Sequence, residues 1–136
     1  MKLRLLLAIA AMLAVQLLLS QLWTAWAAGP EPFVDPDRFR VNLALRSGLF
    51  SLLAVAVGAY IGGRRFLLPA LAIWAMLWLA SGVVLWRIAD GRGSLLELLH
   101  SNWMGLLATL LATVIGGLIG GALHRPPHTG RPASVV

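Results

Sequence analysis

Apolar residues are gathered into four long runs, and polar residues are concentrated in the segments between them. None of the runs alternates apolar and polar residues with the period of two that a barrel strand requires. A bilayer core of about 30 Å is crossed by roughly 20 helical residues, so each run is long enough to span it. We therefore expect an all-α, integral membrane four-helix bundle with spans at about 5–28, 41–63, 66–86 and 95–123.

Two segments outside these spans are polar. The segment 29–40 carries three prolines and is expected to be an exposed loop. Its Asp35 and Asp37 lie beside Arg38 and Arg40, which favours ion pairing over a metal site. The tail 124–136 is basic and rich in proline, so we expect it to be disordered. The rest of the chain, residues 1–123, is expected to form a single transmembrane domain.

The first run has a second interpretation as a signal peptide. Basic residues precede it, and Ala25, Trp26 and Ala27 fit an A-x-A cleavage site. A signal peptide usually has an apolar region of about 7–15 residues, whereas this run stays apolar to Ala28. We favour a retained helix. Cleavage would leave three spans with the same orientation.

The positions of Arg and Lys predict the orientation of the helices. Arg64 and Arg65 occupy a very short connection, where the excess of basic residues on the cytoplasmic side is most informative. Both termini are therefore expected in the cytoplasm. Four tryptophans then form a belt near the outer surface, namely Trp23, Trp26, Trp86 and Trp103.

Composition places the chain in a membrane and excludes several functions. It is 60% hydrophobic and only 12% charged over 136 residues, unlike a water-soluble domain. The net charge of +6 comes from scattered basic residues rather than a basic stripe, which argues against nucleic-acid binding. Arginine greatly exceeds lysine and Ala and Leu are abundant, which suggests a GC-rich bacterial genome and hence a bacterial inner membrane.

Small residues recur every four positions on two of the expected helices. Residues spaced by four form a row along one side of a helix, and we call a row of small residues a ridge. In lipid there is little hydrophobic drive for helices to associate, so such a ridge promotes association by letting two backbones approach closely. The ridges serve packing inside one bundle or, alternatively, pairing of the last helix with its copy in a dimer. The residues expected to pack in this way, as a glycine zipper, are Gly58, Gly62, Ala108, Ala112, Gly116, Gly117, Gly120 and Gly121.

Trp74 and Trp78 are spaced i, i+4 in the middle of the third run and share one helix face. Two indoles on one face could bind an organic cation. Packing against neighbouring helices or lipid is the interpretation we prefer.

Polar residues that could carry chemistry lie near the expected outer ends of the helices. No span has an ionisable residue at its centre, where such a residue would indicate function. The sequence contains no hydrolase triad, metalloprotease or phosphate-loop pattern, so we expect no enzymatic activity, metal or cofactor. An outer polar cluster is expected from Arg46, Arg87, Glu97 and His100.

These observations favour a small inner-membrane protein of structural or accessory type that associates through glycine-rich helix faces. The alternative is a subunit of an oligomeric small-solute transporter or channel, lined by neutral groups such as Gln16, Thr109 and Thr113. The expected partners are the lipid bilayer and a second copy of the chain or another membrane protein.

Overall fold

The computed structural model describes residues 2–26, 36–88 and 94–124. Their helices are α1 (Lys2–Trp26), α2 (Pro36–Gly62), α3 (Leu67–Ile88), α4 (Leu95–Ser101) and α5 (Trp103–Leu123), with the short 3-10 helix η1 (Arg64–Phe66) between α2 and α3. Four helical segments are long and apolar enough to cross a membrane, at Leu3–Trp23, Pro36–Gly62, Arg64–Ile88 and Trp103–Leu123. The expected all-α, multi-span bundle is confirmed.

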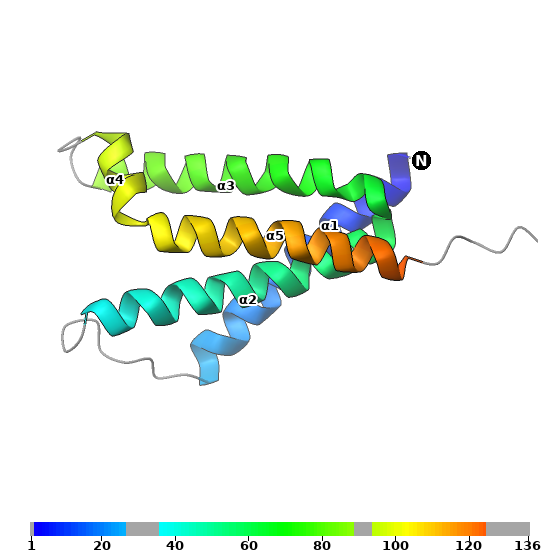
Figure 1. Cartoon of the computed structure of the whole chain (residues 1–136), viewed down its shortest axis with the longest axis horizontal. Helices are drawn as coiled ribbons and strands as arrows, with labels where there is room; N and C mark the ends of the chain where they lie inside the picture. Colours follow the sequence, from blue (N-terminus) through cyan, green and yellow to red (C-terminus); the bar gives the residue numbers. More distant parts are fainter. Residues whose placement is uncertain (1, 27–35, 89–93, 125–136) are drawn as a thin grey trace, which may run out of the picture.

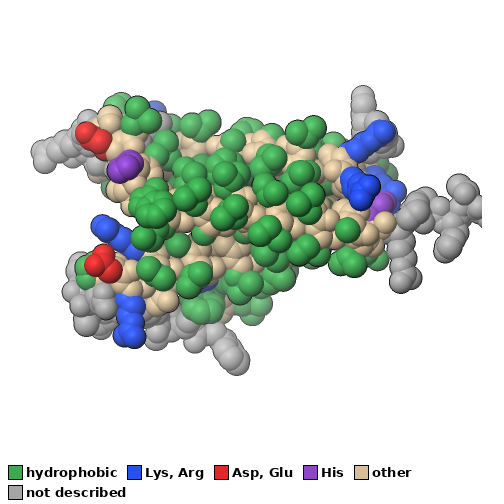
Figure 2. All heavy atoms as spheres, viewed as in Figure 1, with side chains coloured by type: hydrophobic (Ala, Val, Ile, Leu, Met, Phe, Trp, Pro, Cys, Tyr) green, Lys and Arg blue, Asp and Glu red, His purple; other side chains and the backbone are tan. Residues whose placement is uncertain are grey.

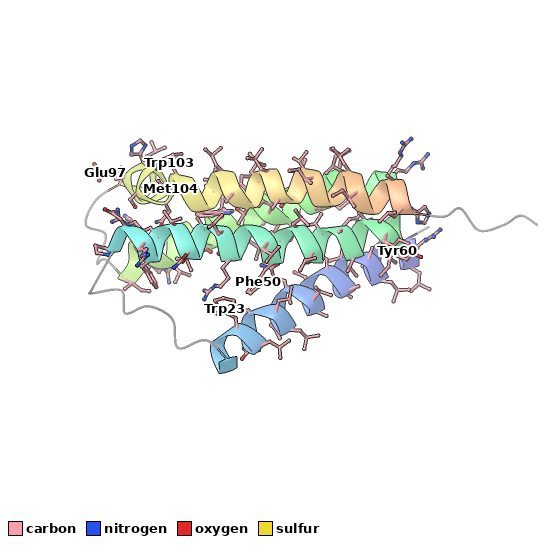
Figure 3. All side chains as sticks on the ribbon, turned by 60° about the horizontal axis from the view of Figure 1, so that its bottom comes forward. Trp23, Phe50, Tyr60, Glu97, Trp103 and Met104 are labelled. Atoms are coloured by element: carbon pink, nitrogen blue, oxygen red, sulfur yellow. The ribbon has the colours of Figure 1, made fainter. Side chains whose placement is uncertain are left out.

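The pair formed by α2 and α5 is the centre of the bundle. These two helices make the most extensive contact in the structure, and they lie side by side in both ribbon views (Figures 1 and 3). Helix α3 lies along the other side of α5 (Figure 1), while α1 packs against α2 at one end and diverges from it toward the other (Figure 3). The order across the bundle is therefore α1, α2, α5 and α3.

Charged side chains lie at the two ends of the bundle, with an apolar band between them (Figure 2). We call one end the arginine end, because it carries Arg4, Arg64 and Arg65. The opposite end, where α4 lies, is called the α4 end (Figure 1). Large apolar side chains on the flanks of α1 and α3 are widely exposed, as expected of surfaces that face lipid.

Helix α2 begins earlier than expected, at Pro36 rather than near residue 41. Proline suits the first helical position because its missing N–H would have no partner there, and Asp37 in the first turn suits the positive end of the helix dipole. Residues 36–40 of the expected loop are therefore helical. Residues 29–35 and 125–136, which include Asp35 and most of the expected tail, lie outside the described residues.

The fourth apolar run is not one helix, in contrast to the expected span 95–123. It breaks at Asn102, whose φ of −107° and ψ of 20° are not helical, and α4 turns away from the axis of α5 (Figure 1). Helix α4 starts with a capping box, in which the Ser94 side chain accepts from Glu97 N and the Glu97 carboxylate accepts from Ser94 N. Only α5 is left as the spanning helix of this run.

Candidate functional site

Two glycines of α5, Gly116 and Gly120, lie directly against the backbone of α2. A Cβ built on Gly116 would lie 2.5 Å from the carbonyl oxygen of Leu52. A Cβ on Gly120 would meet the carbonyl oxygen of Ala56 and lie 2.8 Å from Ala59 Cβ. Only glycine fits at these positions, because the obstructing atoms belong mainly to backbone.

The second glycine ridge of α5 faces a different neighbour. A Cβ on Gly117 would lie 2.6 Å from Leu67 Cδ1, and one on Gly121 would lie 3.3 Å from Arg64 Cα. Gly117 and Gly121 therefore pack against η1 and the start of α3, while Gly116 and Gly120 pack against α2. The two ridges bring three segments of this chain together at the arginine end.

Glycines of α2 receive the ring of Phe66. A Cβ on Gly58 would lie 2.5 Å from Phe66 Cε1, and a Cβ on Gly62 would lie 3.0 Å from Phe66 Cβ and 3.2 Å from Ala8 Cβ of α1. Phe66 and Ala8 are both fully buried. Farther along α5, Ala108 lies against Gly48 of α2, and Ala112 is buried. All eight residues expected to pack helices are thus in contact with, or buried among, other parts of the chain.

Trp74 and Trp78 of α3 both bond to one hydroxyl group of α5. Each indole Nε1 donates to Thr109 Oγ1 at 3.0 Å, and this hydroxyl donates to Gly105 O at 2.8 Å. A threonine hydroxyl has one donor and two acceptor positions, so all its capacity is used. The tryptophan pair therefore joins α3 to α5 through three satisfied polar groups, which is how polar groups are accommodated in an apolar bundle.

A second polar network joins three helices at the arginine end. Arg4 Nε of α1 donates to Ile61 O at 2.8 Å, and His124 Nδ1 lies 2.6 Å from Tyr60 O. These carbonyls belong to the last turn of α2, where the helix itself supplies no partner. Because a carbonyl only accepts, Nδ1 carries the proton, and His124 Nε2 accepts from Arg4 Nη2 at 3.3 Å.

The four residues of the expected outer polar cluster lie on different parts of the α4 end. Arg46 lies 5.6 Å from the centroid of the Trp23 ring, and Trp23 packs edge-on against Phe50 between α1 and α2 (Figure 3). Glu97 and His100 lie together on α4, at an open surface away from Arg46. Arg87 is exposed in the last turn of α3. The structure thus brings Glu97 and His100 together and leaves Arg46 with aromatic rings.

Sequence reasoning missed the acceptor of the two indoles and the partners of the last carbonyls of α2. Both depend on contacts between helices far apart in the chain, for which no local pattern exists.

In the described ranges 2–26, 36–88 and 94–124, no group of three or more His, Asp and Glu side chains gathers as a metal site.

Comparisons with known proteins give no relative. No family model, curated protein or solved structure matches this chain. Its four spanning segments and packed core establish it as a multi-span helical membrane protein.

Proposed function

We propose that the chain is a structural or accessory component of a bacterial inner membrane, without enzymatic activity, whose helices associate through glycine-lined faces. The observation that supports this most is the contact of Gly116 and Gly120 with the α2 backbone, which leaves no room for a side chain. Such a contact fixes the positions of α2 and α5 and leaves the outer surfaces of α1 and α3 available to lipid or a partner. Gly117 lets the start of α3 lie close to α5, because a Cβ there would meet Leu67. A change at Gly117 should therefore disturb any partner that binds the outer surface of α3.

The arginine end is proposed to face the cytoplasm, and α1 is proposed to remain in the mature protein. The position of Arg64 and Arg65 between two spans supports the orientation. The fully buried Ala8, packed close to Gly62, and the bond of Arg4 to Ile61 O support retention of α1, because cleavage would expose this surface of α2.

The intact mass of the protein purified from its native membrane tests this retention. We expect a mass that includes the residues of α1. A mass that begins after Ala27 would show that the first run is a cleaved signal peptide, and α2 would then lose its contacts with Ala8 and Met12.

Purification in mild detergent tests the accessory function. We expect the wild-type chain to purify in a stoichiometric complex with a second copy or with another membrane protein. Gly117→Leu should displace Leu67 and lower recovery of this complex by about tenfold, the equivalent of about 1.4 kcal/mol. Glu97→Gln and His100→Ala, which alter the polar surface of α4, should leave recovery unchanged.

Gly105→Ala is the matched control for this experiment, because a Cβ there makes an ordinary contact of 3.5 Å with Trp78. Circular dichroism of each variant checks that the helices remain folded. A purified wild-type chain that conducts a small solute in proteoliposomes as an oligomer of itself alone, with no partner protein, would contradict the accessory function and support the oligomeric transporter or channel alternative.

A further inference from the structure

A cavity of about 240 Å³ opens at the α4 end between α2, α3 and the start of α5. Its rim carries Asp37 and Arg40 from the first turns of α2, and its deeper wall is formed by Trp78 of α3. Trp103 and Met104 line it from the corner between α4 and α5 (Figure 3). The cavity is thus charged at one side and mainly apolar at the other.

The length of α2 places this rim among the lipid headgroups. A helix of 27 residues is about 40 Å long, which exceeds the apolar core of a bilayer by about 10 Å. At its other end α2 is followed at once by Arg64 and Arg65, which hold that end at the membrane surface. The excess length therefore lies at the α4 end, where it carries Asp37 and Arg40.

The wall of the cavity reaches from this level toward the middle of the membrane. Trp78 lies near the middle of α3 (Leu67–Ile88) and is held there by its bond to Thr109. Pockets that enclose a whole small molecule have volumes of about 300–1,000 Å³, so a cavity of 240 Å³ fits only part of a ligand. Its depth and apolar wall suit a segment of one acyl chain.

Two opposite charges on the rim select the headgroup. Neither Asp37 nor Arg40 forms an ion pair with any residue that the structure describes, and both side chains are exposed. A guanidinium binds phosphate through charge-assisted hydrogen bonds, and a carboxylate accepts bonds from a primary ammonium group. A headgroup that contains phosphate and a primary ammonium group matches both charges.

We propose that this cavity is a binding site for one phosphatidylethanolamine molecule. Its phosphate binds Arg40, its ammonium group binds Asp37, and part of one acyl chain lies against Trp78 and Met104. A phosphatidylglycerol headgroup would place its phosphate beside Asp37 with no ammonium group to offset the repulsion. The quaternary ammonium of phosphatidylcholine has no N–H to donate to the carboxylate. This site does not depend on the accessory function proposed above.

Native mass spectrometry of the full chain, released from micelles with equal amounts of the three lipids, tests the site. We expect the chain to retain one phosphatidylethanolamine molecule, about ten times more often than it retains either of the other lipids. The factor of ten corresponds to the one charge-assisted contact, with Asp37, that the other lipids lack. Asp37→Asn should remove this preference, because only phosphatidylethanolamine donates N–H groups to that carboxylate. Arg40→Gln should instead lower retention of all three lipids, because each of them carries a phosphate. Ala44→Leu should fill the cavity and lower retention of all three lipids.

Arg87→Gln is the matched control, because it removes one exposed positive charge at the same end without touching the cavity. It should leave both the preference and the retention of each lipid unchanged, and thermal unfolding should show that all variants remain folded. Equal retention of the three lipids, a preference for phosphatidylcholine, or an equal effect of Arg87→Gln and Arg40→Gln would each overturn the proposal. Competition by water-soluble glycerophosphoethanolamine would also overturn it, because binding would then need no acyl chain.

Discussion

Gly120→Ala is expected to destabilise the folded bundle by about 3 kcal/mol, the upper end of the usual cost of overpacking. The added methyl group would meet the carbonyl oxygen of Ala56 and lie 2.8 Å from Ala59 Cβ. A backbone carbonyl within α2 cannot move aside as the end of a flexible side chain can. Relief therefore requires α2 and α5 to separate along their contact, which weakens the dispersion attraction that holds helices together in lipid.

This expected loss of stability is the opposite of what helix propensity alone would give. Alanine is favoured over glycine in a helix interior by about 1 kcal/mol, so a stabilised variant would result if Gly120 only faced lipid. Unfolding of the purified protein in mixed micelles of increasing SDS content, followed by tryptophan fluorescence, measures the difference.

Gly105→Ala on the same helix provides the control. A Cβ at Gly105 would lie 3.5 Å from the Trp78 ring, an ordinary contact, so this variant should be as stable as the wild type or more stable by up to about 1 kcal/mol. If Gly120→Ala and Gly105→Ala gave the same unfolding curve, the contact between α2 and α5 would not be what requires glycine.

The spanning segments could be predicted from the sequence because apolar length is a property of each segment alone. The third run, expected at 66–86, is close to α3 at Leu67–Ile88. The break at Asn102 was missed because the apolar residues on both sides of it met the length criterion together. The polar residues from His100 to Asn102 and the pattern from Ser94 to Glu97 were the available signals of a short separate helix.

The small residues could be identified from the sequence, but their neighbours could not. A repeat of four marks which side of a helix is smooth, whereas the helix that lies on that side depends on the whole bundle. Gly116 and Gly117 are adjacent in sequence, yet one faces Leu52 of α2 and the other Leu67 of α3.

The positions of the expected outer polar cluster could not be predicted for the same reason. The sequence indicates that these residues lie at a similar depth in the membrane, but it does not say where each helix lies around the bundle. Arg46 lies at the side of α1, while Glu97 lies on α4.

Thr109→Val is expected to destabilise the bundle by about 1–2 kcal/mol, although the two side chains have nearly the same shape. The variant removes the oxygen that accepts from Trp74 and Trp78, so two partly buried indole N–H groups lose their partner. Hydrogen bonds between helices in a membrane contribute about 0.6 kcal/mol on average and at most about 1.7 kcal/mol, and two of them are lost here. The same unfolding measurement gives the loss, and ultraviolet resonance Raman spectra of the indole N–H report the missing bonds directly.

Thr109→Ser separates this effect from packing, because serine keeps the hydroxyl group and lacks only the methyl group. It should retain the Raman signature of two bonded indoles and most of the stability. If the serine and valine variants had equal stability and equal spectra, the indoles would be held by packing alone. A loss confined to valine would instead show that one hydroxyl of α5 fixes α3 in place, which also fixes Trp78 at the wall of the lipid cavity.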